Sequence, residues 1–437
     1  MKKMKRKLIS IGFALTVLLT LAACGNKGGD SAKEDGKTTI DFAIHVANPA
    51  DQEPAFNAVV EAFKKENPEI DINLEGKEQS EHVKNMKMRS QSDKLPDIFW
   101  MLPASAKELQ EAGVLADLSD FLKDNKDIKD SFDGRENMID PFKDGKNQYG
   151  MPYQPLVTGL YYNKKVLSDN GFEKPETFED LMKIAKTLDE KDIVTISKGA
   201  KDSYSVWAFL IMLSRYGYLD KVDDILAGKE KYNNKDFIHY YEKIAELRDA
   251  GAFPKNVSTQ SYFQAVEQFT TGKSAMLDSG SWDVQKIESS DVGSDVGFWW
   301  GPTFNDGVGN QYLSSIVPSA PLVVSKAAFE DKDKKAAIEK FLAFYYGQEG
   351  IQIMVDNKIP PMTNISVEVD EKESPVFADI INNMEDSKWT SQENQPDLVV
   401  SESIGNAMYD SIYGVIVGNY TPEEAAKVVQ NRIDDTK

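Results

Sequence analysis

Aromatic residues at the ends of predicted strands are the first side chains that could bind a ligand. Trp100 ends a short predicted strand, and Trp282 follows the turn Ser279–Ser281 after another. Indole rings stack on the apolar C–H faces of pyranose sugars, and the sugar hydroxyls then require amide and carboxylate partners. Because α/β proteins build ligand crevices at strand ends and helix starts, we expect both tryptophans to line such a crevice.

Two further tryptophans are weaker candidates for the same site. Trp207 lies in a helix predicted to begin near Ser203, and Trp300 precedes the turn Gly301-Pro302. Core packing is the alternative explanation for any aromatic residue, and Trp300 could serve only to support its turn. The residue types therefore favour an aromatic sugar site without deciding which rings belong to it.

Patterns typical of catalysis or metal binding are absent from the sequence. The three histidines, His45, His82 and His239, lack metal-ligand spacing, and there is no P-loop, G-x-G-x-x-G or G-x-S-x-G motif. We therefore expect no metal, no cofactor and no catalytic residue, and the protein should not be an enzyme. A glycosidase needs only two carboxylates, which could lie among the 71 acidic residues, so that alternative stays open.

The charge of the chain restricts its partners. The formal net charge is −20, and removal of the five positive charges at the N-terminus leaves about −25. Such a surface repels phosphate backbones and anionic lipids, which argues against nucleic acid as a partner and against electrostatic membrane binding.

The N-terminus carries an export signal. A basic start is followed by the uncharged run Leu8–Ala23, which is too short to span a bilayer comfortably. The run closes at Leu21-Ala22-Ala23-Cys24, which resembles a bacterial lipobox. We expect residues 1–23 to be a signal peptide, Cys24 to carry the lipid, and residues 24–37 to be a flexible tether. Because Cys24 is the only cysteine, no internal disulfide is possible.

The elements that must position the aromatic residues begin with a strand–helix–strand pattern. Strands are predicted over Ile40–Val46 and Ile70–Leu74, with a helix over Pro54–Glu66 between them and another strand over Pro96–Trp100. This order predicts a right-handed parallel crossover in an α/β sheet. About 400 residues remain after the tether, which is too long for one core, so two domains are expected.

The later chain is richer in helix signals. Helix starts are predicted at Thr177, Asn234 and Thr421, and short buried strands over Ala275–Leu277 and Pro321–Val324. These elements support two α/β lobes but do not show how the lobes connect.

The order of several short motifs resembles the extracellular solute-binding lipoproteins of ABC sugar importers, the maltose-binding-protein-like family. The resemblance covers essentially all of Thr38–Asp434. It rests on the segments Leu95–Trp100, Tyr149–Pro152, Leu160–Lys164, Pro175–Leu181, Gly272–Leu277 and Gly280–Trp282.

The resemblance implies a periplasmic-binding-protein-like α/β fold with two lobes, a hinge and a ligand cleft between the lobes. The first lobe would comprise residues 38–151 and 317–365, and the second residues 152–316 and 366–437. Hinges would lie near Met151-Pro152 and Ser315–Val317, and the lobes would close on the ligand.

The resemblance also implies ligand-binding residues in this chain. They are Trp100, Trp282, Tyr204, Trp207, Tyr153, Trp300, Gln79, Asp51 and Gln52. Two departures from the family pattern alter the pocket: His45 stands where many relatives have tryptophan, and Ser401–Gly414 contains only tyrosines, Tyr409 and Tyr413, instead of a late tryptophan.

The implied function is capture of a carbohydrate, with an oligosaccharide favoured, and delivery to membrane permease subunits. The protein would be a monomer, held on the outer face of the bacterial cell membrane by its lipid. The alternatives are a binding protein for a peptide, polyamine or glycerophosphodiester, a lipid-anchored glycosidase, or an adhesin-like surface protein.

Overall fold

The computed structural model describes residues 37–201, 205–365, 367 and 369–436. The predicted signal peptide, the lipidation site Cys24, most of the tether and the candidate Tyr204 lie outside these residues. Among the residues described, no helix is both long and apolar enough to cross a bilayer.

The first sheet contains the predicted strand–helix–strand unit. Its strand order is β2 (Ile70–Gly76), β1 (Thr38–Ile44), β3 (Ile98–Trp100), β13 (Pro321–Val324) and β6 (Met151–Pro152). β1 pairs in parallel with β2 and with β3, which confirms the predicted parallel crossover, whereas β13 is antiparallel to β3 and to β6. The predicted helix over Pro54–Glu66 is confirmed as α2, and its apolar side chains are buried against the sheet core.

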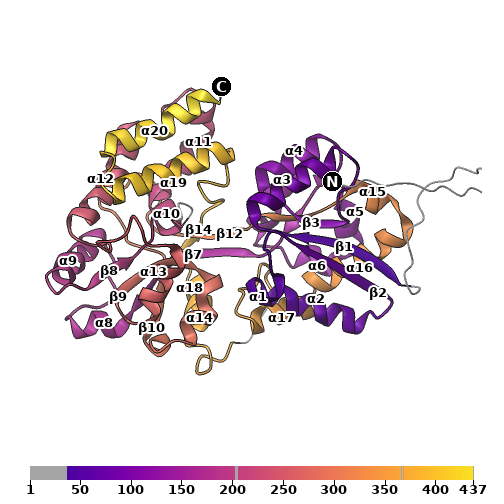
Figure 1. Cartoon of the computed structure of the whole chain (residues 1–437), viewed down its shortest axis with the longest axis horizontal. Helices are drawn as coiled ribbons and strands as arrows, with labels where there is room; N and C mark the ends of the chain where they lie inside the picture. Colours follow the sequence, from indigo (N-terminus) through magenta and orange to yellow (C-terminus); the bar gives the residue numbers. More distant parts are fainter. Residues whose placement is uncertain (1–36, 202–204, 366, 368, 437) are drawn as a thin grey trace, which may run out of the picture.

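The remaining helices of this half surround the sheet (Figure 1). They are α1 (Pro49–Gln52), α3 (Gln79–Ser90), α4 (Pro103–Glu111), α5 (Ser119–Asp124), α6 (Lys126–Asp130), α7 (Glu136–Ile139), α15 (Lys326–Glu330), α16 (Lys332–Tyr346) and α17 (Gln348–Asp356). β4 (Lys143–Asp144) and β5 (Asn147–Gln148) form a small hairpin, after which the chain enters β6 of the first sheet.

The second sheet is of mixed direction. Its order is β10 (Val296–Trp299), β7 (Pro155–Asn163), β9 (Ser274–Gly280) and β8 (Val194–Ser197), and β12 (Ile316–Pro318) pairs with the start of β7. β7 is antiparallel to β10, β9 and β12, whereas β8 is parallel to β9. β11 (Leu313–Ser314) and β14 (Thr390–Ser391) form a separate sheet of two parallel strands.

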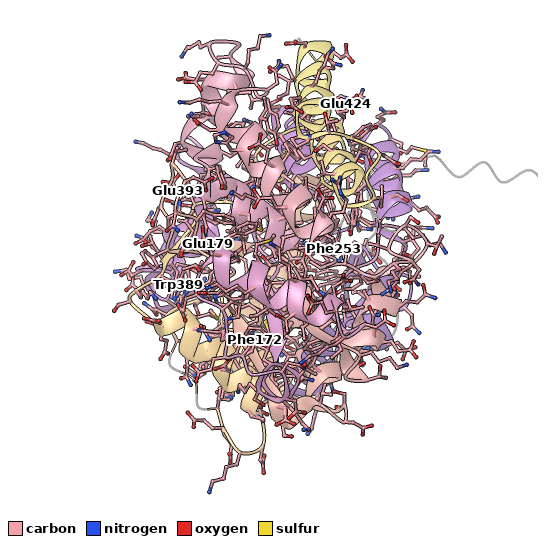
Figure 2. The ribbon with its side chains drawn as sticks, turned by 90° about the vertical axis from the view of Figure 1, so that its left-hand side faces the viewer. Phe172, Glu179, Phe253, Trp389, Glu393 and Glu424 are labelled. Atoms are coloured by element: carbon pink, nitrogen blue, oxygen red, sulfur yellow. The ribbon has the colours of Figure 1, made fainter. Side chains whose placement is uncertain are left out.

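Helices cover this second sheet and extend beyond it. They are α8 (Lys164–Asp169), α9 (Phe178–Asp189), α10 (Trp207–Arg215), α11 (Tyr218–Leu226), α12 (Lys235–Asp249), α13 (Tyr262–Thr270), α14 (Val284–Glu288), α18 (Pro375–Glu385), α19 (Glu402–Ile416) and α20 (Pro422–Asp435). The outer face of this half carries exposed acidic side chains from separate segments, among them Glu179, Glu393 and Glu424, which fits the acidic composition (Figure 2).

The two sheets define two lobes that stand side by side, with β7 and β12 running between them (Figure 1). The pairs in this crossing are Ile316 with Val157, Val317 with Leu156, and Pro318 with Pro155. The largest core cluster takes residues from Ile40 to Tyr153 and from Ala320 to Met362. This division supports the lobes expected from the sequence, and their exact boundaries stay a prediction.

Three predicted helix starts are confirmed by their caps. Thr177 accepts a hydrogen bond from the Asp180 amide, and Asn234 accepts from two amides of α12. Thr421 forms a reciprocal capping box with Glu424.

The helix containing Trp207 begins later than predicted. α10 starts at Trp207 itself, rather than near Ser203. The reason is a contact between residues far apart in the sequence. The Asp278 carboxylate of β9 accepts a hydrogen bond from the Ala208 amide at 2.8 Å. Asp278 thus satisfies a free amide in the first turn of α10, as a local capping side chain would otherwise do.

Candidate ligand-binding cleft

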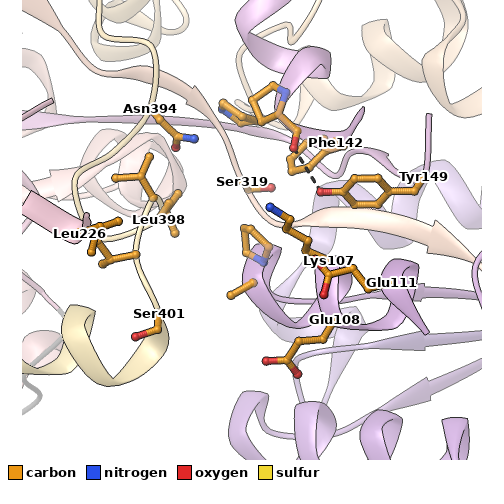
Figure 3. A pocket seen from close by; sticks show the side chains of 16 residues that line it. Lys107, Glu108, Glu111, Phe142, Tyr149, Leu226, Ser319, Asn394, Leu398 and Ser401 are labelled. Atoms are coloured by element: carbon orange, nitrogen blue, oxygen red, sulfur yellow. Dashed lines mark hydrogen bonds between the residues drawn. The ribbon is translucent and has the colours of Figure 1, made fainter. Parts of the chain in front are cut away.

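A pocket of about 440 Å³ lies between the lobes (Figure 3). On the first lobe, α4 presents Lys107, Glu108 and Glu111, beside Phe142 and Tyr149. The facing wall belongs to the second lobe, and the end of β12 with the residue that follows it lies between the two walls. The second-lobe wall and this segment contribute Leu226, Asn394, Leu398, Val399, Val400, Ser401, Pro318 and Ser319.

Both polar and apolar side chains line this pocket, as in sites that bind polar organic ligands. Tyr149 donates a hydrogen bond to the Pro141 carbonyl at 3.2 Å, and burial raises the pKa of Tyr149, so its hydroxyl stays protonated. None of the sequence-predicted ligand residues that the structure describes lines the pocket. Tyr149 belongs to a motif that carried the family resemblance, and Ser401 begins the segment Ser401–Gly414 where relatives have a late tryptophan, but nothing in the sequence marks Asn394 or residues 398–400.

A cluster of rings in the first lobe lies next to the crossing. Trp100 ends β3 and is buried, and the His45 ring stacks on it with centroids 4.0 Å apart and planes at 14°. Tyr153 is also buried, edge-on to His45 at 5.9 Å. One face of the Trp100 indole is therefore covered by His45 rather than open to a sugar.

Glu53 joins this cluster at the start of α2. Its Oε1 lies 3.8 Å from His45 Nε2. Burial raises the pKa of Glu53 to about 7, although the nearby Tyr153 hydroxyl and Gln154 amide partly oppose the rise. Burial, helped by the charge of His82, lowers the pKa of His45 to about 3. His45 is thus neutral at physiological pH, and the contact with Glu53 is not an ion pair.

A second cluster of rings lies in the second lobe, after β9. Trp282 is half-buried, and its indole Nε1 donates to Tyr262 Oη at 2.8 Å. Tyr262 in turn donates to Asp283, which also accepts from Ser279 Oγ at 2.6 Å. Trp207 is half-buried too and meets Trp282 edge to face at 4.8 Å. This network fixes the Trp282 ring while leaving part of both indoles exposed.

A buried ion pair holds the segment that leads to Trp207. Lys198 donates to the Asp278 carboxylate and to the Ser205 carbonyl, and both charged side chains are almost wholly buried. Tyr413 donates to the Gly199 carbonyl at 2.8 Å. Since Asp278 also binds the first turn of α10, these contacts hold Gly199, Ser205 and the start of α10 together.

The two clusters lie at different points along β7, the strand that crosses from the first lobe to the second. Tyr153 precedes β7, and Thr158 within β7 pairs with Gly280, two residues before Trp282. Five residues of extended chain span at most about 18 Å. The backbone positions of Tyr153 and Thr158 therefore lie within about 18 Å of each other.

The other predicted residues lie elsewhere. Trp300 is fully buried and packs edge-on against Phe298, and its carbonyl accepts from Arg215 at 2.9 Å, so it supports its turn and offers no free ring face. Asp51 and Gln52 are exposed in the second half of α1, and Gln79 is exposed as the first residue of α3.

Comparison with known proteins assigns the chain to a family. The model of the bacterial extracellular solute-binding proteins matches residues 58–378. Two relatives are the multiple sugar-binding protein of Streptococcus mutans, 23% identical over 86% of each chain, and a maltooligosaccharide ABC transporter solute-binding lipoprotein of Streptococcus pneumoniae, 22% identical over 97% of this chain and 96% of the relative.

A solved structure shares the fold. A chitin oligosaccharide binding protein superposes with a TM-score of 0.76 at 22% identity, covering 91% of this chain and 98% of that one. The family match, the two-lobed fold and the cleft between the lobes agree, and this chain is a member of the bacterial extracellular solute-binding proteins.

Proposed function

We propose that this protein captures a carbohydrate, with an oligosaccharide favoured, between its lobes and delivers it to the permease of an ABC transporter. The observation that carries the proposal is the pair of half-buried indoles, Trp207 and Trp282, held beside the crossing by a buried hydrogen-bond network. Two relatives support the proposal, because their names describe them as binding sugars. Binding on both lobes would stabilise a closed state that a permease could recognise.

The chain would act without catalysis. The buried carboxylates of the second-lobe cluster are engaged in structural bonds: Asp283 with Tyr262 and Ser279, and Asp278 with Lys198. Such groups hold rings and loops in place and do not form the pair of free carboxylates that glycoside hydrolysis requires. Stability of the bound sugar during long incubation, followed by chromatography, tests this part.

Lipidation of Cys24 would keep the protein on the outer face of the membrane, and the protein would act there as a monomer. The lone cysteine after an uncharged N-terminal run supports this proposal. Incorporation of labelled palmitate into the wild-type chain, but not into Cys24→Ala, is the expected result. Release of the variant into the medium would accompany it.

The sugar site is tested by titrating the full chain, kept in detergent, with maltotriose, raffinose and di-N-acetylchitobiose. We expect a saturable change in tryptophan fluorescence with at least one of them. Trp282→Ala should weaken that sugar at least about tenfold, because a stacking platform of about 1.4 kcal/mol is lost. Phe329→Ala, an aromatic truncation in α15 beyond the far end of β13, is the matched control and should bind normally.

A folded wild-type chain that binds none of these sugars would shift the proposal to a peptide or glycerophosphodiester ligand. Sugar binding that survives Trp282→Ala unchanged would instead remove the indole pair from the site.

A further inference from the structure

An exposed ring continues the second-lobe cluster of rings. Among the residues that the structure describes, Phe263 is the most exposed large apolar side chain, at 65%. Single apolar side chains on a surface are ordinary, but Phe263 does not stand alone. Its ring centroid lies 5.4 Å from that of Tyr262, Tyr262 lies 5.4 Å from Trp207, and Trp207 lies 4.8 Å from Trp282. The four rings therefore form one continuous row that ends at Phe263.

The first turn of α13 supports the end of this row. Ser261 and Gln264 form a reciprocal capping box, in which the Ser261 amide donates to Gln264 Oε1 at 2.9 Å and the Gln264 amide donates to Ser261 Oγ at 3.3 Å. Tyr262, next to Phe263, is buried, and its hydroxyl accepts from the Trp282 indole at 2.8 Å. A backbone that is fixed before binding loses little conformational entropy when a ligand arrives.

The start of α13 lies at the crossing between the lobes. Tyr262 belongs to the same buried cluster as Val157 and Ile316, which pair where β7 and β12 cross. Figure 1 shows α13 close to β7 and β9. A ligand that lies on the indole pair and extends along the row of rings would therefore reach Phe263.

The neighbours of Phe263 match a sugar rather than a phosphate-bearing ligand. Gln264 and Glu267 are exposed on the same helix, and Glu267 follows Phe263 by one helical turn. An aromatic face stacks on the apolar C–H face of a sugar, while amide and carboxylate groups bond its hydroxyls. α13 contains no lysine or arginine, so this helix supplies no cation for a phosphate.

We propose that Phe263, with Gln264 and Glu267, forms an outer subsite that binds the additional rings of a longer oligosaccharide. This subsite rests on the proposed carbohydrate-binding function and deepens it, because it makes chain length a determinant of specificity. The indole pair contacts short and long sugars alike, and Phe263 contacts only the long ones.

The test is calorimetric titration of the full chain in detergent with a short and a long sugar of one series. The pairs are maltotriose with maltohexaose, raffinose with stachyose, and di-N-acetylchitobiose with hexa-N-acetylchitohexaose. In the series that binds most tightly, wild type should bind the longer sugar at least about fivefold more tightly, because one more ring is stacked. Phe263→Ala should remove this gain and keep the affinity for the shorter sugar within about twofold of wild type.

Two further variants separate direct contact from a structural role. Tyr312→Ala truncates another exposed aromatic side chain of the same lobe and should keep the gain with length. Phe263→Trp retains an aromatic face and should keep it too. Because Phe263 is mostly exposed, Phe263→Ala should unfold at the wild-type Tm. Equal weakening of the short and the long sugar by Phe263→Ala would mean that Phe263 only positions Tyr262 and the indoles, and would overturn the outer subsite.

The remaining outcomes distinguish the two proposals. If wild type binds a short sugar but gains nothing with length, or if Phe263→Ala keeps the gain, the outer subsite is wrong and the carbohydrate function stands. If folded wild type binds no sugar, the carbohydrate function fails and the subsite falls with it.

Discussion

In the first lobe an indole is covered by an imidazole whose polar atoms have no good partner, whereas in the second lobe two indoles stand half exposed and their supporting polar groups are fully bonded. The difference shows how the same residue type takes two roles. In the second lobe the polar neighbours of the indoles form hydrogen bonds with one another, so part of each indole face remains exposed. In the first lobe the Trp100 indole instead packs against an imidazole that has a buried nitrogen without a hydrogen bond.

The largest effect is expected at the buried ion pair that holds the second-lobe cluster. Asp278→Ala leaves Lys198 buried without its counter-charge and removes the acceptor of the Ala208 amide. We expect a loss of about 3–5 kcal/mol in the free energy of unfolding, measured by urea denaturation. A loss below about 1 kcal/mol would mean that the pair does not hold this lobe together.

The next effect concerns the pH dependence of the first-lobe cluster. The folded pKa of Glu53, about 7, lies above the ordinary value of 4.5, so the folded chain keeps a proton that the unfolded chain releases. Glu53 therefore contributes stability at low pH that is lost as pH rises from about 4.5 to 7, by up to about 3 kcal/mol. His45 acts oppositely, since its low folded pKa makes stability fall as pH drops below 6.5.

Comparing the pH dependence of stability in wild type and Glu53→Gln separates the contribution of the Glu53 carboxyl from that of His45, because both proteins retain His45. The free energy of unfolding of Glu53→Gln, relative to wild type, should increase with pH between 4.5 and 7 and then level off. Parallel stability curves for the two proteins would contradict the burial of this group.

A smaller effect is expected for the second-lobe tyrosine. Tyr262→Phe removes the acceptor of the Trp282 indole and a donor to the buried Asp283. About 2 kcal/mol of stability should be lost, as for other buried groups deprived of a partner. Urea denaturation gives the value, and an unchanged midpoint would show that the network has a replacement donor.

The smallest effect is expected for the corresponding change in the first lobe. Tyr153→Phe removes a buried hydroxyl that has no hydrogen bond of ordinary geometry and a looser interaction with the Glu53 carboxyl, so the free energy of unfolding should fall by less than about 1 kcal/mol. The contrast with Tyr262→Phe is the direct measure of the difference between the lobes. Equal losses in the two variants would abolish that difference.

Local sequence signals predicted the fold better than the site. Capping residues such as Thr177 and Thr421 act within three residues of themselves, so the pattern alone identifies the helix start. The true start of α10 depends on Asp278, which follows 70 residues later and has no local signature.

The same distinction applies to the candidate site residues. Trp100 ends a strand as predicted, but the ring that covers it, His45, directly follows the neighbouring strand β1 and meets Trp100 only in the folded sheet. Pocket residues such as Asn394 lie in an irregular segment with no periodicity to identify them. Sequence patterns show which residues are able to bind a ligand, and tertiary packing decides which of them remain accessible.

The proline pair in the crossing has a mechanical consequence. Pro155 and Pro318 face each other where β7 and β12 reach the first lobe, and neither has an amide hydrogen to donate. One residue further on, the Ser319 amide donates to the Gln154 carbonyl at 2.9 Å. The crossing can thus flex at the prolines without breaking a backbone bond there, while the bonded residues on either side keep the two strands from sliding. We therefore expect β7 and β12 to permit a rotation at this pair, which would let the walls of the cleft approach each other without a change in strand register.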